Sequence, residues 1–354
     1  MLHGHPKSNG FAFVAFASPE PAGLRALFDR LGIPEIATSK CGALTLHRQR
    51  AITFLVDGAP EGFGAKFVQA HGPSAFALGF RVANALDALA WLVDQGATAI
   101  DQAAAPLPFP AIQGVGGSHL YLVDEEQEEA IFARSFEFRT DWQNLVRSND
   151  TGLDSIDHLT HNLFSGGIGI WRRFYESLFG FREIRSFDID GRLTGLLSTA
   201  MANSNGNIRI PLNEPKSDAG KLDQIQEFLS AYGGEGIQHI ALSCRNIYQT
   251  VETLVARSVG MQETPQTYYA GLESRLPGHG EPLEALRRLG ILLDGRTGIP
   301  NKRLLLQIFS KPAIGPIFFE FIQRKGDEGF GEGNFRALFE SLELDQINRG
   351  VLKH

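Results

Sequence analysis

The sequence predicts an α+β protein made of two similar halves, because the same order of strand and helix patterns occurs twice along the chain. The apolar segment 11–16, followed by a helical pattern over 21–31, resembles segment 156–161 followed by a helical pattern over 170–179. Each copy starts with an apolar strand, continues with a helix, and then passes through Gly into another strand. A recurrence at this distance indicates an internal duplication.

A second pair of segments repeats more clearly. The strand pattern 76–84 leads into a helix over 85–95, and the strand pattern 238–246 leads into a helix over 247–257. Both strand patterns end in Asn. The chain is therefore predicted to hold four strand–helix–strands units, two in each half.

Shorter strand patterns complete these units, for example 207–213 and 303–309. The polar segment 148–152 has turn chemistry and is predicted to link the halves. We therefore expect an N-terminal domain over residues 1–148 and a C-terminal domain over residues 152–354.

Composition favours a cytoplasmic protein that binds a small molecule. The 354 residues are 43% hydrophobic, which allows a large core, and no apolar run reaches the roughly 18 residues of a membrane span. The first residues lack the apolar stretch of a secretory signal. The net charge of −7 argues against nucleic acid or an anionic membrane as partner. Cys41 and Cys244 are far apart and are expected to be reduced core residues.

Three candidate metal ligands, His158, His239 and Glu320, lie on three separate apolar strands of the second half. Any one of them alone is better explained as a hydrogen-bonded core residue, or as a side chain that faces solvent. Together they favour a shared cation, because a buried unpaired charge costs several kcal/mol. Two imidazoles and one carboxylate suit a divalent iron with coordination positions left for other ligands.

The duplication supplies an internal control for this metal site. Superposing the repeats places Phe13 at the position of His158, Ala77 at that of His239, and Ala133 at that of Glu320. All three are apolar, so we expect the first half to be a metal-free copy.

Six blocks of sequence resemble the 4-hydroxyphenylpyruvate dioxygenase family of the vicinal oxygen chelate superfamily, over nearly the whole chain and most strongly from Ile156 to Leu352. The blocks are Ile156-Asp-His-Leu-Thr-His-Asn, Arg209-Ile-Pro-Leu-Asn-Glu-Pro, Gly234-Glu-Gly-Ile-Gln-His-Ile-Ala, Thr267-Tyr-Tyr, Leu305-Leu-Gln-Ile-Phe, and Phe319-Glu-Phe-Ile-Gln-Arg-Lys-Gly with Gly329-Phe-Gly-Glu-Gly-Asn-Phe.

The resemblance implies a fold of four βαβββ modules in two domains, each an open mixed-sheet barrel. It also implies Fe(II) held by His158, His239 and Glu320, with His161 on the opposite face of its strand. The implied substrate-binding residues are polar groups followed by aromatic and lid residues: Ser198, Asn213, Gln224, Gln238, Gln307, Phe309, Phe318, Phe330, Asn334 and Phe335.

The reaction implied by this resemblance converts 4-hydroxyphenylpyruvate and O2 to homogentisate and CO2, a step of tyrosine and phenylalanine catabolism. We expect a homo-oligomer, and a C-terminal helix over 334–352, preceded by the glycine-rich segment 326–333, that closes the pocket. Alternatively, the helix over 334–352 does not close the pocket and only packs on its own domain. Three other functions stay open: 4-hydroxymandelate synthase with the same substrate and iron site, an extradiol dioxygenase, and a non-catalytic binding protein of the same fold.

Overall fold

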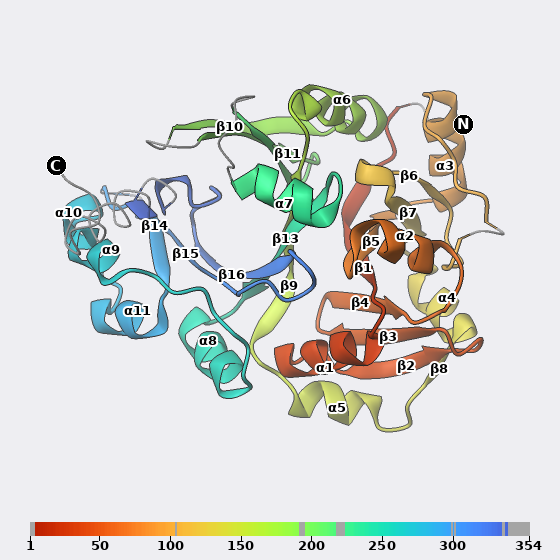
Figure 1. Cartoon of the computed structure of the whole chain (residues 1–354), viewed down its shortest axis with the longest axis horizontal. Coiled ribbons are helices and arrows are strands. Elements are labelled where there is room, and N and C mark those ends of the chain that lie inside the picture. The colour runs from red at the N-terminus through yellow and green to blue at the C-terminus, as the bar shows by residue number, and fades with distance from the viewer. Residues whose placement is uncertain are drawn as a thin grey trace.

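The computed structural model describes residues 4–102, 105–190, 195–216, 224–298, 300, 302–334 and 337–338. The chain folds into two halves that lie side by side, the first on the right of Figure 1 and the second on the left. Each half is built on one eight-stranded mixed sheet flanked by helices. Among the described residues, no helix is both long and apolar enough to span a membrane.

The first half carries strands β1 to β8 and helices α1 to α5. Its strands are β1 (Ser8–Ala17), β2 (Glu35–Ser39), β3 (Leu44–Gln49), β4 (Ile52–Asp57), β5 (Ser74–Val82), β6 (Ala111–Gln113), β7 (His119–Asp124) and β8 (Phe136–Phe138). Its helices are α1 (Pro21–Leu31), α2 (Phe63–His71), α3 (Ala85–Asp94), α4 (Glu128–Ser135) and α5 (Trp142–Ser148), with a 3-10 turn at Val115–Gly117.

The second half repeats this plan with an inserted helical segment. Its strands are β9 (Leu153–Asn162), β10 (Arg182–Asp190), β11 (Gly195–Ala202), β12 (Arg209–Pro215), β13 (Gly236–Cys244), β14 (Leu292–Arg296), β15 (Arg303–Phe309) and β16 (Phe318–Lys325). Its helices are α6 (Gly167–Phe179), α7 (Gln224–Tyr232), α8 (Ile247–Ala256), α9 (Gln266–Ala270), α10 (Leu272–Arg275) and α11 (Leu283–Leu289).

The strand orders are β6-β7-β5-β1-β4-β3-β2-β8 and β10-β11-β12-β9-β13-β16-β15-β14. With the first order read in reverse, β2-β3-β4-β1-β5-β7-β6 corresponds to β10-β11-β12-β9-β13-β16-β15, and the sheets differ by one further strand at opposite ends, β8 in the first and β14 in the second. In each sheet, one antiparallel pair lies between two parallel pairs, β1 with β5 in the first sheet and β9 with β13 in the second. The next strand on either side of the pair is parallel to its neighbour: β4 and β7 in the first sheet, β12 and β16 in the second. This duplicated arrangement of mixed half-barrels confirms the predicted α+β, vicinal oxygen chelate fold. The predicted linker, 148–152, runs from the last residue of α5 to the residue before β9. The division into two independent domains stays a prediction.

The helices form where their sequences carry apolar residues at helical spacing. In α1 the buried side chains are Leu24, Leu27, Phe28 and Leu31, which line one face. Asn84 and Asn246, the residues at the ends of the two repeated strands, cap α3 and α8 by accepting bonds from backbone N–H groups. The cap residue is therefore part of the repeat.

Aromatic side chains hold the two halves together. Phe54 of β4 lies 6.2 Å from Phe319 of β16 between ring centroids, and Phe80 of β5 lies 5.8 Å from Phe181. All four are buried, so the interface between the halves is continuous with the hydrophobic core.

Two sequence predictions were wrong. Ala133 does not take the place of Glu320, because it lies in α4 and the strand that corresponds to β16 is β7. Cys41 is not a core residue: it is exposed, whereas Cys244 is buried, and both are free thiols. Cys41 lies between β2 and β3, where the chain turns at the protein surface.

Candidate metal centre and pocket

Strand pairing brings the three predicted metal ligands to one face of the second sheet. Ala241 of β13 pairs with His158 of β9 on one side and with Glu320 of β16 on the other, so these residues form a row across three neighbouring strands. His239 lies two residues before Ala241 and therefore points to the same face. The methyl group of Ala241 leaves the space between the two longer side chains free.

The ligating atoms of these side chains converge. His158 Nε2 lies 3.1 Å from Glu320 Oε2, His239 Nε2 lies 3.4 Å from the same oxygen, and the two Nε2 atoms are 3.4 Å apart. The side chains are at most 10% exposed. Glu320 Oε1 is buried without a hydrogen-bond partner, although a buried carboxylate oxygen normally has one. A shared cation would satisfy this oxygen, and the donor set is that of non-haem iron sites.

The electrostatics of the group reflect burial and mutual charge. Burial lowers the pKa of His158, but the Glu320 and Asp157 carboxylates raise it more, so that the pKa lies above its ordinary value. Burial lowers the pKa of His239. Burial would raise the pKa of Glu320, but His158 and His239 lower it to about 2. The site therefore keeps a carboxylate available as a ligand at neutral pH.

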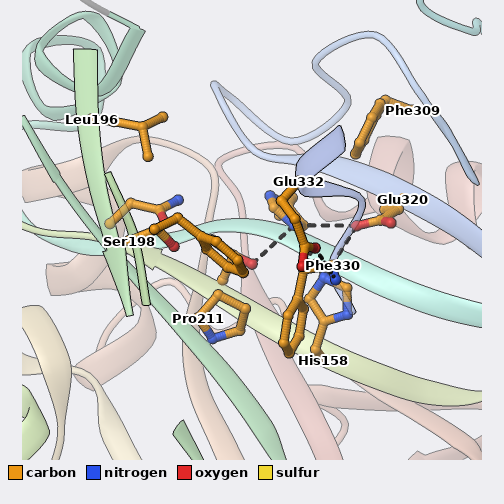
Figure 2. A pocket seen from close by; sticks show the side chains of 12 residues that line it. His158, Leu196, Ser198, Pro211, Phe309, Glu320, Phe330 and Glu332 are labelled. Atoms are coloured by element: carbon orange, nitrogen blue, oxygen red, sulfur yellow. Dashed lines mark hydrogen bonds and ion pairs between the residues drawn. The ribbon is translucent and has the colours of Figure 1, made fainter. Parts of the chain in front are cut away.

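The three candidate ligands line a pocket. Four of the predicted substrate-binding residues line it: Ser198, Asn213, Phe309 and Phe330. Figure 2 shows Leu196, Ser198 and Pro211 on one side, Phe309 and Glu320 on the other, and Phe330 beside His158. Phe330 meets the His158 ring edge-on, with 5.3 Å between ring centroids. The pocket thus combines aromatic walls with neutral polar groups, as small-molecule sites do.

Three further predicted residues lie against the site without lining the pocket. Phe318 stacks on His239 with 5.1 Å between ring centroids. Gln307 is buried, and its Oε1 has no hydrogen-bond partner. Gly331 lies so close to this side chain that a Cβ added to the glycine would be only 2.3 Å from that oxygen. Gln238 Oε1 lies 3.0 Å from His239 Nδ1. The predicted substrate contacts of these residues stay predictions.

The remaining predicted residues lie farther from the ligands. Asn334 is buried and its Oδ1 accepts a hydrogen bond from the Tyr268 hydroxyl at 2.6 Å. Gln224 is exposed at the start of α7. Phe335 lies outside the described residues, as does most of the predicted gating helix 334–352. The roles predicted for these segments therefore stay predictions.

Several pocket residues were not found from the sequence. Thr160, Phe187, Leu196 and Glu332 line the pocket. Thr160 Oγ1 lies 2.9 Å from His239 Nε2, and its position two residues after His158 on a strand could have identified it. Glu332 pairs with Arg185 at 3.2 Å, a contact between segments far apart in sequence that no local pattern predicts.

This chain is similar in sequence to known proteins over nearly its whole length. A family profile described as hydroxyphenylpyruvate dioxygenase, N-terminal, matches residues 6–137, and one for the glyoxalase/bleomycin resistance protein/dioxygenase superfamily matches residues 155–274. The chain is 48% identical to 4-hydroxyphenylpyruvate dioxygenase of Pseudomonas aeruginosa, over 99% of this chain and 98% of that protein. It is 47% identical to hemolysin VllY of Vibrio vulnificus, over 98% and 97% of the two chains.

A solved structure has the same overall arrangement. A mutant of 4-hydroxymandelate synthase from Streptomyces coelicolor superposes with a TM-score of 0.78 at 27% identity, over 96% of this chain and 99% of that chain. The likeness to these relatives therefore covers both halves of the chain and nearly its whole length. On this sequence similarity, the chain belongs to the 4-hydroxyphenylpyruvate dioxygenase family.

Proposed function

We propose that this chain is an Fe(II)-dependent dioxygenase that converts 4-hydroxyphenylpyruvate and O2 to homogentisate and CO2. The observation that carries the proposal is the buried group of His158, His239 and Glu320 at the base of a pocket, in a chain 48% identical to a curated 4-hydroxyphenylpyruvate dioxygenase. All carbon, hydrogen and oxygen atoms of the two reactants are accounted for in the two products.

His158 and His239 would hold the iron through Nε2, and Glu320 through a carboxylate oxygen. When bound, Fe(II) supplies the Lewis acidity and redox chemistry that oxygen activation and decarboxylation need. The low pKa of Glu320 keeps this ligand ionised over the whole neutral range. His158 and His239 must be unprotonated at Nε2 to serve as ligands, so acid conditions compete with metal binding.

The pocket residues have positioning roles in this proposal. Phe309 and Phe330 would pack against the faces of the substrate's aromatic ring. Ser198 and Asn213 pair across β11 and β12 and would contact its polar groups. These neutral groups can bind a phenol or a keto acid without competing with the substrate for the metal. Aromatic side chains around the site would also limit the entry of water.

The test is product analysis. Anaerobically purified protein is supplied with Fe(II), then with 4-hydroxyphenylpyruvate and O2, and without 2-oxoglutarate. We expect homogentisate and CO2 in equal amounts, with no product when Fe(II) is removed by a chelator. Hydroxymandelate as the main product would contradict ring hydroxylation but would not contradict the proposed iron site. Failure of the folded protein to bind iron would contradict the proposal as a whole.

A further inference from the structure

Both ligating histidines follow directly on a β-bulge. Between β9 and β13, Ala241 pairs with His158 and Leu242 pairs with Ile156, so Asp157 is an extra residue on β9. On the other side of the row, His161 pairs with Ile237 and Thr160 with His239, so Gln238 is an extra residue on β13. Residues next to each other on a regular strand point to opposite faces, and a bulge changes the direction of the extra side chain.

At both bulges the extra side chain contacts the histidine that follows it. Asp157 Oδ1 lies 2.8 Å from His158 Nδ1, and Gln238 Oε1 lies 3.0 Å from His239 Nδ1. A ring nitrogen that donates its proton to such an oxygen leaves the other nitrogen with its lone pair, which is the form that binds metal. In each ring, Nε2 is the atom that faces the other ligands.

The first half has the same two bulges without the polar side chains. Its pairings make Ala12 the extra residue before Phe13, and Phe76 the extra residue before Ala77. The bulges therefore belong to the fold. The oxygen-bearing side chains occur at them only in the half where a histidine follows.

Asp157 differs from Gln238 because it is charged and because two arginines connect it to the turn after β16. Arg324 donates to both Asp157 oxygens at 2.8 Å, and to the backbone carbonyls of Asp327 at 3.1 Å and Gly329 at 2.6 Å. Its guanidinium carbon lies 5.7 Å from the centre of the Phe330 ring. Arg209 lies between the same carboxylate and Glu328.

We infer that Asp157 is a positioning residue that fixes the ligating form of His158 and, through Arg324, couples this ligand to the 327–330 turn that places Phe330 in the pocket. A carboxylate can only accept from Nδ1, whereas an amide can turn either its oxygen or its nitrogen toward the ring, so Asp157 imposes the form more strictly than Gln238. The inference rests on the proposed iron site and extends it to the pocket wall.

The experiment compares Asp157→Ala, Asp157→Asn and Arg324→Gln with the parent. Two properties are measured: the anaerobic dissociation constant of Fe(II), by competition with a chelator, and backbone hydrogen exchange over residues 326–331. We expect Asp157→Ala to weaken Fe(II) binding by about 10- to 100-fold, the range seen when an outer partner of a metal ligand is removed. Asp157→Asn retains an oxygen that can accept from Nδ1, so its loss should be smaller. All three variants should speed exchange over 326–331, because Arg324 loses a partner or is absent.

Glu128→Ala is the matched control, since Glu128 and Arg81 form a similarly buried two-bond ion pair in the first half. It should change neither Fe(II) affinity nor exchange over 326–331, so a general loss of stability is distinguished from the specific effect. Parent-like Fe(II) binding by a folded Asp157→Ala protein would overturn the positioning role. Unchanged exchange in Arg324→Gln would overturn the coupling to the turn. If the parent binds no Fe(II), the proposed function fails instead, and the exchange measurement still decides the coupling.

Discussion

The two halves of the molecule have the same strand pairing and different side chains in one row of residues. In the second half the row is His158, Ala241 and Glu320. In the first half the corresponding pairings give Phe13, Gly79 and Tyr121. The backbone that brings two candidate metal ligands together in one half brings two aromatic rings together in the other.

The row in the first half is aromatic and closely packed, whereas the row in the second half carries ionisable side chains. Phe13 and Tyr121 are fully buried, with 5.7 Å between ring centroids, and Phe109 lies 5.9 Å from Phe13. A Cβ on Gly79 would lie 2.8 Å from the Phe13 ring, so the ring occupies the space above this glycine. Strand register therefore brings the same row of positions together in both halves, and the side chains in that row decide whether it can hold a metal or forms part of the core.

The largest effect is expected from Glu320→Gln, which keeps the size of the side chain and removes its charge. Fe(II) affinity and homogentisate formation should fall by more than the roughly 100-fold that loss of an outer ligand partner causes. The matched change in the first half, Tyr121→Phe, should leave both unchanged, as measured by iron content and by product assay. A Glu320→Gln protein that retains stoichiometric iron would contradict the ligand assignment.

A second change should affect stability and leave metal binding intact. Phe13→Ala removes a fully buried ring from the aromatic row and should lower the free energy of unfolding by about 3–5 kcal/mol, measured in urea. The Fe(II) affinity of the protein that stays folded should equal that of the parent, because no ligand is touched. Loss of iron binding without loss of stability would show that this row is more than core.

The smallest effect concerns pH and His47. Burial lowers the pKa of His47 to about 4, below its ordinary value of 6.5. Between these values the unfolded chain takes up a proton that the folded protein does not, so stability falls as pH falls from 6.5 to 4. Met201 occupies the position in the second half that corresponds to His47 in the first. His47 of β3 pairs with Phe54 of β4, and Met201 of β11 pairs with Ile210 of β12.

Replacing His47 by the residue of the other half, His47→Met, should therefore flatten this pH dependence. The slope of the unfolding free energy should decrease by at most about 1.4 kcal/mol per pH unit, measured by urea unfolding at a series of pH values. A variant at Met201 offers the control: Met201→Leu removes no titrating group and should keep the parent's slope. An unchanged slope in His47→Met would mean that this imidazole titrates alike in both states.

Features that depend on local patterns and on residue type could be predicted from the sequence. Apolar periodicity located α1, α3, α6 and α8 to within three residues at each end, and the repeat predicted the duplicated α+β plan. Similar blocks in a fixed order identified the family. The candidates His158, His239 and Glu320 stood out because ionisable residues are costly in apolar strands unless they share a partner.

Features that depend on pairing between distant strands could not be predicted in this way. A shift of one residue in strand register turns every side chain to the other face, and bulges change that register without a sequence pattern that marks them. For this reason the sequence comparison matched Glu320 with Ala133, whereas Tyr121 is the residue at the corresponding position. It also did not identify Thr160 as a pocket residue or Asp157 as the partner of His158. The chemistry of the side chains was enough to predict which residues could bind metal. The residues around them depend on how β9, β13 and β16 are aligned. That alignment is made by contacts between segments some 80 residues apart, so the sequence does not show it.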